Sequence, residues 1–143
     1  MEVKTNSPKE TQKVAQKLAR DLIPGDVVAL YGNLGAGKTV FVQGLAKGLN
    51  IKRNITSPTF VFMRSYAFVH KRIPGTFYHL DLYRGQDKSD FSSLGLDEIF
   101  SPDTIVVLEW AEKIKNSLPK KRIDVVIENV NEKVRKIKIK RHK

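Results

Sequence analysis

Residues 32–39 read Gly-Asn-Leu-Gly-Ala-Gly-Lys-Thr, and they match the phosphate-binding pattern G-x-x-x-x-G-K-[ST] at every constrained position. Glycines let such a loop adopt backbone conformations that other residues avoid, so that successive N–H groups can point at phosphate oxygens. We expect the Lys38 ammonium to reach the β- and γ-phosphates, and the Thr39 hydroxyl to bind a Mg²⁺ ion that bridges them. The segment therefore predicts a nucleotide-binding site.

The residues on either side of this loop predict the strand and the helix that such a site needs. Residues 26–31 form a short apolar run that is typical of a buried strand. Residues 39–49 carry apolar side chains at helical spacing. A helix that begins at the loop directs its free N–H groups and its partial positive charge at the phosphates.

Local patterns along the rest of the chain indicate both helices and antiparallel hairpins. The predicted segments are a helix over 8–22, strands 60–66 and 76–81 around a turn that includes Pro74-Gly75, a short helix over 94–100, a buried strand over 104–109, a helix over 111–117, and a hairpin of 123–128 with 134–139. Together they predict a three-layer α/β fold like that of P-loop NTPases, with a mixed sheet that includes antiparallel hairpins. We expect one domain over 1–143.

Composition excludes several classes of protein. The chain has no cysteine, which rules out disulfides, thiolate metal sites and a cysteine nucleophile. No apolar run approaches the roughly 18 residues of a membrane span, and the first residues lack the apolar segment of a secretion signal. We therefore expect a cytoplasmic protein without membrane contact.

The basic charge of the chain is concentrated near its end. The net charge is +11, and residues 133–143 hold seven Lys or Arg side chains and no Asp or Glu. One interpretation is a basic patch that attracts RNA or an acidic protein surface. The other is a solvated, lysine-rich edge strand that resists aggregation. The sequence does not favour either interpretation.

A Mg²⁺ site beside the loop needs a carboxylate, and two strand ends offer one. Glu109 ends the most apolar strand, and Asp81 ends the strand predicted over 76–81. We expect Glu109 to bind the metal directly or through water, and Asp81 to support that site or orient the attacking water. Lys38, Asp81 and Glu109 are thus the candidate catalytic residues, although either carboxylate could simply mark a strand end.

Two neighbours of these carboxylates are ambiguous. His79 could pair with Asp81 or with a phosphate, or it could be an ordinary half-buried strand residue. Trp110 follows Glu109 directly, and a lone tryptophan is more often part of a core than of a site.

Further motifs accompany the loop in a fixed order. They are Ser-Pro-Thr-Phe at 57–60, His-Leu-Asp-Leu-Tyr-Arg at 79–84 and Glu-Trp at 109–110. In this combination the chain resembles, over nearly its whole length, the bacterial tRNA threonylcarbamoyladenosine biosynthesis ATPases of the TsaE family, also called YjeE.

The resemblance implies an activity, cofactors and partners. It implies that ATP and Mg²⁺ are bound and ATP is hydrolysed in support of threonylcarbamoyl transfer to a tRNA adenosine, which TsaD-like and TsaB-like proteins carry out. It also implies that segments 57–60 and 79–84 are switches, that Thr39 and Glu109 are the metal ligands, and that Trp110 belongs to a nucleotide or partner surface. The nucleotide-binding residues implied are Thr11 near adenine, and Asn33, Leu34, Gly35, Ala36, Gly37, Lys38, Thr39 and Val40.

Other functions are compatible with part of this pattern. A nucleotide-dependent RNA or protein adaptor would use the basic C-terminal residues for possible tRNA contact, and its hydrolysis would be incidental. The interpretation as a GTPase or a small-molecule kinase has less support, because the chain has no Asn-Lys-x-Asp stretch of the kind that selects guanine.

If the protein is an ATPase, Arg84 could serve as its arginine finger in cis.

Overall fold

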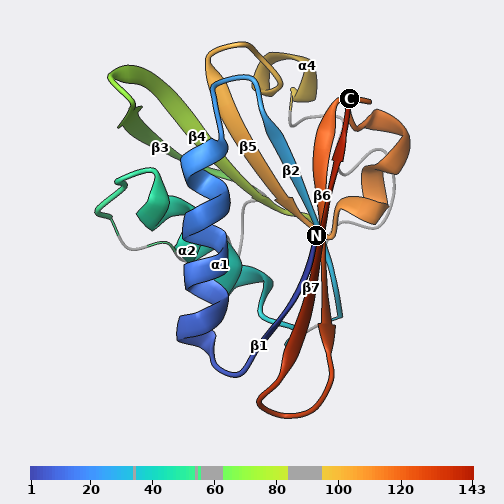
Figure 1. Ribbon diagram of the computed structural model, residues 1–143. Coiled ribbons are helices and arrows are strands. Elements are labelled where there is room, and N and C mark those ends of the chain that lie inside the picture. Colours follow the sequence, from blue (N-terminus) through green and yellow to red (C-terminus); the bar gives the residue numbers. More distant parts are fainter. Residues whose placement is uncertain (34, 54, 56–62, 84–94) are drawn as a thin grey trace.

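The computed structural model describes residues 1–33, 35–53, 55, 63–83 and 95–143 (Figure 1). Within these residues the strands form one mixed sheet in the order β1-β7-β6-β2-β5-β4-β3. In chain order the elements are β1 (Glu2–Thr5), α1 (Pro8–Asp21), β2 (Val27–Tyr31), α2 (Lys38–Gly48), β3 (Met63–His70), β4 (Ile73–Asp81), α4 (Leu96–Ile99), β5 (Thr104–Glu109), the 3₁₀ helix η1 (Ala111–Ser117), β6 (Arg122–Asn129) and β7 (Arg135–His142).

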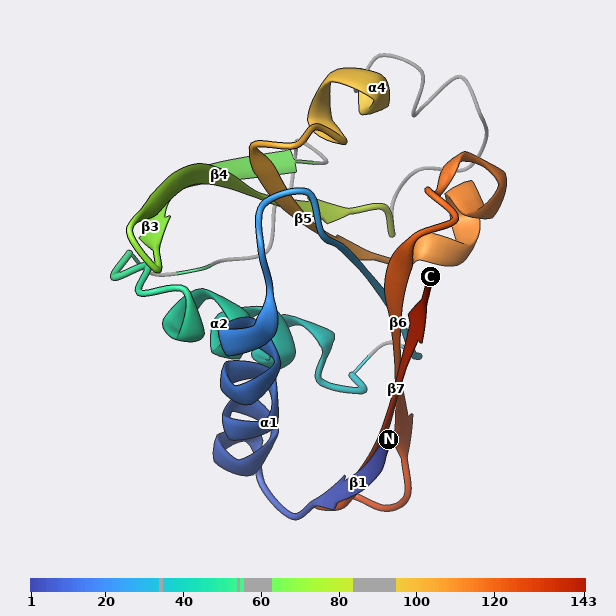
Figure 2. The same ribbon diagram turned by 45° about the horizontal axis from the view of Figure 1, so that its top comes forward.

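The centre of the sheet is parallel and its margins are antiparallel. β2 lies between β5 and β6 and is parallel to both, and β4 continues the parallel part beside β5. The pairs β3–β4, β6–β7 and β1–β7 are antiparallel. Helices α1 and α2 cover one face, whereas α4 and η1 lie on the other (Figure 2). These layers confirm the predicted α/β fold with its mixed sheet and hairpins.

Strand β5 is the most enclosed part of the sheet, since every residue from Thr104 to Glu109 is buried. This confirms the prediction from its uninterrupted apolar run, which is typical of a strand covered on both faces. The strand therefore delivers the Glu109 carboxylate to the carboxyl edge of the sheet, where the loop after β2 also begins.

Two glycines set the distance between α1 and α2. A Cβ atom on Gly44 would lie 2.5 Å from the Gln12 carbonyl oxygen, and one on Gly48 would lie 2.5 Å from the Ala19 Cβ. Both separations are shorter than van der Waals contact, so only glycine permits this approach. The start of α1 agrees with its prediction, because the Ser7 hydroxyl accepts a hydrogen bond from the Glu10 N–H at 3.1 Å.

The N-terminal strand β1 was missing from the sequence prediction. Its four residues pair antiparallel with β7, with Glu2 opposite Lys138 and Thr5 opposite Arg135. A strand this short has little periodicity of its own and is stabilised by its partner. Since β1 covers the first half of β7, the interpretation of that half as an edge strand was wrong.

The predicted turn at Pro74-Gly75 was also wrong. Lys71 and Arg72 form the turn, with φ angles of 52° and 67°, and Pro74 and Gly75 lie inside β4. Pro74 is tolerated because pairing of β4 with β5 begins only at Thr76. Glycine is required at 75, since a Cβ there would lie 2.8 Å from the Asp103 carbonyl oxygen, which belongs to the backbone.

Other boundaries moved by smaller amounts. The segment 111–117 is a 3₁₀ helix interrupted at Ile114, where φ is −127°. β3 continues to His70, and residues 60–62 of the strand predicted there lie outside the described part. The strand 104–109 and the terminal hairpin are confirmed.

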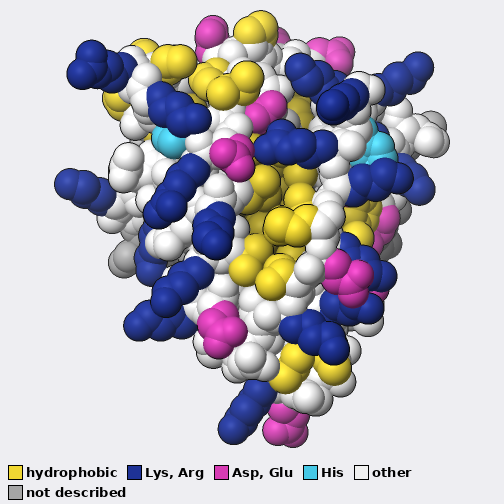
Figure 3. Space-filling model, viewed as in Figure 1, with side chains coloured by type: hydrophobic (Ala, Val, Ile, Leu, Met, Phe, Trp, Pro, Cys, Tyr) yellow, Lys and Arg dark blue, Asp and Glu magenta, His cyan; other side chains and the backbone are white. Residues whose placement is uncertain are grey.

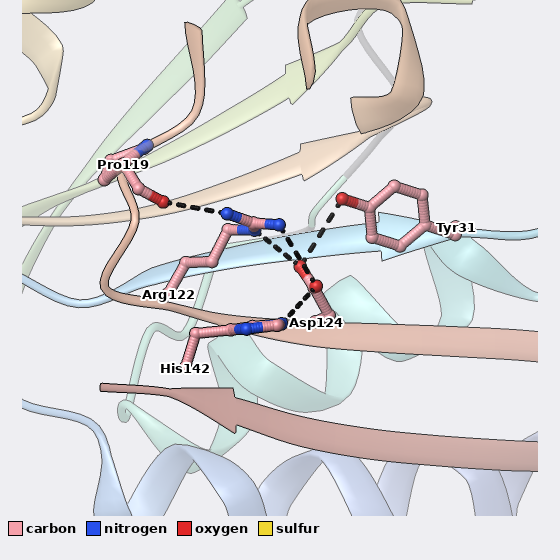
Figure 4. A network of polar contacts seen from close by, with 5 residues as sticks. All are labelled: Tyr31, Pro119, Arg122, Asp124 and His142. Atoms are coloured by element: carbon pink, nitrogen blue, oxygen red, sulfur yellow. Dashed lines mark hydrogen bonds and ion pairs between the residues drawn. The ribbon is translucent and has the colours of Figure 1, made fainter. Parts of the chain in front are cut away.

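A polar network ties the C-terminal strand to the sheet (Figure 4). The Asp124 carboxylate accepts hydrogen bonds from Arg122 Nε at 2.9 Å, His142 Nε2 at 2.7 Å and the Tyr31 hydroxyl at 3.4 Å. These donors come from β2, β6 and β7, so the network joins three neighbouring strands. Burial, followed by the Asp124 charge, raises the pKa of Tyr31.

No helix in the described part has the length and hydropathy that crossing a membrane requires.

Candidate nucleotide and metal site

The loop between β2 and α2 has the backbone conformation that its glycines predicted. Gly35 and Gly37 adopt φ angles of 80° and 101°, which favour glycine, and Gly37 directly precedes the first residue of α2. The free N–H groups at the start of α2 therefore face the loop. Leu34, one of the predicted nucleotide-binding residues, lies outside the described residues.

The Lys38 side chain turns back toward the loop. Its Nζ donates to the carbonyl oxygens of Gly32 and Asn33, the latter at 3.1 Å, and it lies 3.9 Å from the centre of the Trp110 ring. Lys38 is only 5% exposed, and burial lowers its pKa, while the charge of Glu109 opposes that shift. The loop, the ring and the carboxylate together hold a cation where phosphates were predicted.

The two predicted metal ligands meet in the structure. Thr39 Oγ1 donates to Glu109 Oε1 at 3.3 Å, although the residues are 70 positions apart in the sequence. A hydroxyl and a carboxylate are oxygen donors of the kind that Mg²⁺ prefers. Among the described residues, no group of three or more His, Cys, Asp or Glu could hold a metal ion. Thr39 and Glu109 supply two oxygen ligands, which fits Mg²⁺ because this ion usually keeps water and phosphate oxygens in its other positions.

His79 contacts Glu109 rather than Asp81. The imidazole is fully buried, and its Nε2 lies 2.5 Å from Glu109 Oε2. With the carboxylate as acceptor, Nε2 carries the proton. The expectation that His79 is half-buried was therefore wrong, and so was the expectation that it pairs with Asp81. The contact leaves Oε1 as the carboxylate oxygen that faces Thr39.

Asp81 lies next to Glu109 in the sheet, because the two residues are paired in register across β4 and β5. Burial, and then the charge of Glu109, raises the pKa of Asp81. The Tyr83 N–H opposes this by donating to Asp81 Oδ1 at 3.1 Å. A carboxylate with a raised pKa beside a second carboxylate has the properties of a proton acceptor or water-orienting group.

Trp110 is partly buried against the core on one face of the sheet and also contacts Lys38. Its ring contacts the Lys38 ammonium and also the Tyr83 ring, whose centre is 5.1 Å from that of Trp110. The residue adopts a positive φ of 60°, which is uncommon outside glycine and turns the chain directly after Glu109. Trp110 therefore packs partly against the core, as the sequence favoured, and also contacts Lys38 of the candidate site.

A cavity of about 420 Å³ adjoins the loop. It brings together Thr11 with Gly35, Ala36, Gly37 and Val40, all of them predicted nucleotide-binding residues. Thr11 is 2% exposed, and its hydroxyl lies 2.7 Å from that of Thr5. The remaining lining residues are Asn6, Ser7, Pro8, Glu132, Lys133 and Arg135.

Sequence reasoning missed the role of Arg135, which it counted only as part of a basic patch. The guanidinium donates from Nε to the Ala36 carbonyl at 3.1 Å and from Nη2 to the Gly35 carbonyl at 3.5 Å. Its Nη1 donates to the Asn131 carbonyl at 2.7 Å. Arg135 thus joins the hairpin between β6 and β7 to the phosphate loop. No local pattern identifies this contact, because Arg135 and Ala36 are 99 residues apart in the sequence.

Two predicted switch elements fall partly outside the described residues. The whole of the first switch, residues 57–60, lies outside the described residues, and so does Arg84, the candidate arginine finger. Of the second switch, His79 and Asp81 lie beside Glu109, and the Tyr83 carbonyl accepts a hydrogen bond from Lys113 Nζ at 2.5 Å.

Comparisons with known proteins identify the family. The family model described as "Threonylcarbamoyl adenosine biosynthesis protein TsaE" matches residues 5–137. The protein of that name from Bacillus subtilis (strain 168) is 41% identical over 134 residues, which cover 94% of this chain and 81% of the relative. Its counterpart from Treponema pallidum (strain Nichols) is 39% identical and covers 85% of this chain and 86% of the relative.

A solved structure supports the same assignment. The crystal structure of Bacillus subtilis YdiB matches with a TM-score of 0.82 and 34% sequence identity, and covers all of this chain and 86% of that one. The fold, the order of the motifs and the family match over most of the chain therefore agree: this chain belongs to the TsaE family, which acts in tRNA threonylcarbamoyladenosine biosynthesis.

Proposed function

We propose that this protein binds ATP with Mg²⁺ and hydrolyses it, and that hydrolysis acts as a switch for a TsaD-like and TsaB-like transferase in the cytoplasm. The observation that carries the proposal is the meeting of Thr39 Oγ1 and Glu109 Oε1 at 3.3 Å, beside Lys38. Phosphoryl transfer requires a phosphate loop, a cation and oxygen ligands for a metal ion. Here a phosphate loop, a buried cation and two such oxygen ligands lie at one edge of the sheet.

Each residue at the edge has a separate task in this proposal. The loop amides and Lys38 bind the phosphate oxygens, and the cavity that contains Thr11 and Val40 accepts the nucleoside. Thr39 and Glu109 would hold Mg²⁺, which neutralises charge on the phosphates during transfer. Asp81, whose pKa burial raises, orients the attacking water and accepts its proton. Trp110 covers the Lys38 ammonium and limits its contact with solvent.

Matched variants test the metal roles. Thr39→Ala and Glu109→Ala should each lower Mg²⁺-dependent turnover by about 100-fold, or about 3 kcal/mol, because charge stabilisation by the metal acts mainly in the transition state. Calorimetric ATP affinity should fall much less, whereas Lys38→Ala should weaken binding itself. Equal losses of affinity and turnover in the Thr39 and Glu109 variants would contradict the assigned metal ligands.

The switch role needs a separate experiment. ATP turnover should be measured for the protein alone, with tRNA, and with purified TsaD-like and TsaB-like proteins. Stimulation by the transferase proteins is expected, since phosphate-loop switches commonly complete their site with a partner. A rate that these proteins leave unchanged would support the alternative of an adaptor with incidental hydrolysis.

A further inference from the structure

The basic C-terminal strand is less available to a partner than its sequence suggests. Lys136 Nζ lies 2.8 Å from Glu2 Oε1, and Lys138 Nζ lies 3.5 Å from Glu128 Oε1. Arg135 is engaged with carbonyl groups of the phosphate loop. Much of the positive charge on β7 therefore has a partner within the fold.

A different surface combines several cations with a concave shape. A groove of about 760 Å³ runs between α1 and α2, and three cationic side chains line it, those of Lys47, Lys52 and Arg53. Among the described residues that line it, none carries a carboxylate. Figure 3 shows Lys and Arg side chains gathered over the α1 side of the molecule.

The cations of the groove take part in no ion pair among those that the described residues form. Lys47 Nζ instead donates to Gln12 Oε1 at 2.9 Å, and the Arg53 guanidinium lies 5.7 Å from the centre of the Tyr66 ring. Both contacts hold a cation in place without neutralising it. The groove therefore keeps its positive charge.

Side-chain amides lie between these cations. Gln12 and Gln16 come from α1 and Gln43 comes from α2, so that both walls of the groove present amides. Gln12 Nε2 donates to Gln43 Oε1 at 3.2 Å and Gln43 Nε2 donates to the Ile55 carbonyl at 3.3 Å, so each of these amides keeps only part of its hydrogen-bonding capacity for phosphate oxygens or hydroxyl groups. The exposed residues Lys9, Lys13 and Lys17 follow the same helix at intervals of four, a spacing at which like charges repel. An isolated helix gains nothing from this arrangement.

We propose that the groove between α1 and α2 binds the sugar–phosphate backbone of RNA. Cations neutralise phosphates, and amides can pair with both phosphate oxygens and ribose 2′-hydroxyls, which an acidic protein segment lacks. The family acts in tRNA modification, so RNA is the polyanion that its pathway handles. The groove does not include the residues proposed to bind ATP, so the two proposals can fail independently.

The test compares two variants with the same loss of charge. The groove variant is Lys47→Gln with Lys52→Gln and Arg53→Gln. The control is Lys138→Gln with Lys140→Gln and Lys143→Gln, all exposed positions near the C-terminus. Binding of a fluorescein-labelled, unmodified tRNA transcript is followed by anisotropy without nucleotide at several KCl concentrations, and thermal melts by circular dichroism check folding.

We expect the groove variant to lose at least about tenfold in affinity and its salt slope to fall by about 2 to 3, because up to three phosphate contacts disappear. The control should lose less than threefold. A second variant, Lys13→Gln with Lys17→Gln, alters only exposed side chains and should weaken binding in the same direction even if the first variant folds poorly.

Three outcomes would overturn the proposal. Equal losses in groove and control variants would show a general effect of net charge. A larger loss in the control would place RNA on the C-terminal strand. Displacement of tRNA by polyglutamate at equal charge concentration would identify the groove as a site for an acidic protein.

Discussion

The Nε2 atom of His79 on β4 and the Oε2 atom of Glu109 on β5 lie 2.5 Å apart, and both side chains are buried. The contact holds one carboxylate oxygen, so that the other faces the Thr39 hydroxyl. His79 is therefore a positioning residue for the proposed metal ligand. Hydrogen-bond partners that orient a metal ligand commonly matter nearly as much as the ligand itself.

Removing this contact should weaken the response to Mg²⁺. His79→Leu deletes the donor, and we expect the Mg²⁺ concentration for half-maximal ATP hydrolysis to rise by about 10-fold or more. His79→Gln, which can place an amide donor near the same position, should recover much of the loss. A Leu variant with unchanged Mg²⁺ dependence would show that the contact does not position Glu109.

Arg135 should control nucleotide affinity through the loop carbonyls that it binds. Arg135→Gln is expected to weaken ATP binding by about tenfold, or about 1.4 kcal/mol, measured by calorimetry. Arg135→Lys should recover little of that affinity, because a single ammonium cannot reproduce the planar fork. The matched control is Lys136→Gln, which removes only an exposed ion pair with Glu2 and should change little.

Asp81 should reduce stability at neutral pH. Its raised pKa means that the folded protein holds the carboxyl proton more tightly than the unfolded chain does, so ionised Asp81 costs stability above the raised pKa. Asp81→Asn should therefore increase the free energy of unfolding at pH 7, and this advantage should disappear below the ordinary value of 3.8. Urea titrations of both proteins across this pH range measure it, and an advantage that grew toward low pH would be inconsistent with this sign.

Trp110 provides a direct signal for the site, because it is the only tryptophan of the chain and lies 3.9 Å from the Lys38 ammonium. Phosphates that attract the ammonium should alter the surroundings of the ring. We expect saturable changes in tryptophan emission on adding ATP with Mg²⁺, and their loss in Lys38→Ala. Unchanged emission while calorimetry records binding would indicate that the nucleotide lies elsewhere.

Gly44 should be needed for the packing of α1 on α2. Alanine at this position improves helix propensity by about 1 kcal/mol. Overpacking typically costs about 1–3 kcal/mol, and here the added Cβ would lie 2.5 Å from a backbone oxygen that cannot rotate away. The cost of overpacking exceeds the gain in helix propensity, so Gly44→Ala should lower the thermal midpoint of unfolding. A midpoint at or above that of the parent protein would show that the helices can separate without loss.

The phosphate loop and the strand that ends in Glu109 were predictable, because the residues that determine each of them are consecutive in the sequence. The glycines of 32–39 determine the backbone of the loop, and the apolar run of 104–109 is sufficient to predict a buried strand that ends in Glu109. The family motifs extend over the same local segments. Sequence therefore supplied the fold class and the separate members of the candidate site.

Contacts between distant segments could not be predicted in this way. The pairing of β1 with β7, the hydrogen bonds from Arg135 to the loop and the contact of His79 with Glu109 all join residues that no local pattern relates. Charge is the clearest case, because a run of basic residues indicates how many cations there are and not which of them find partners. Only the packing of the sheet and helices decided that Lys136 is paired while Lys47 faces an open groove, since electrostatic partners are set by distance in space and not by order along the chain.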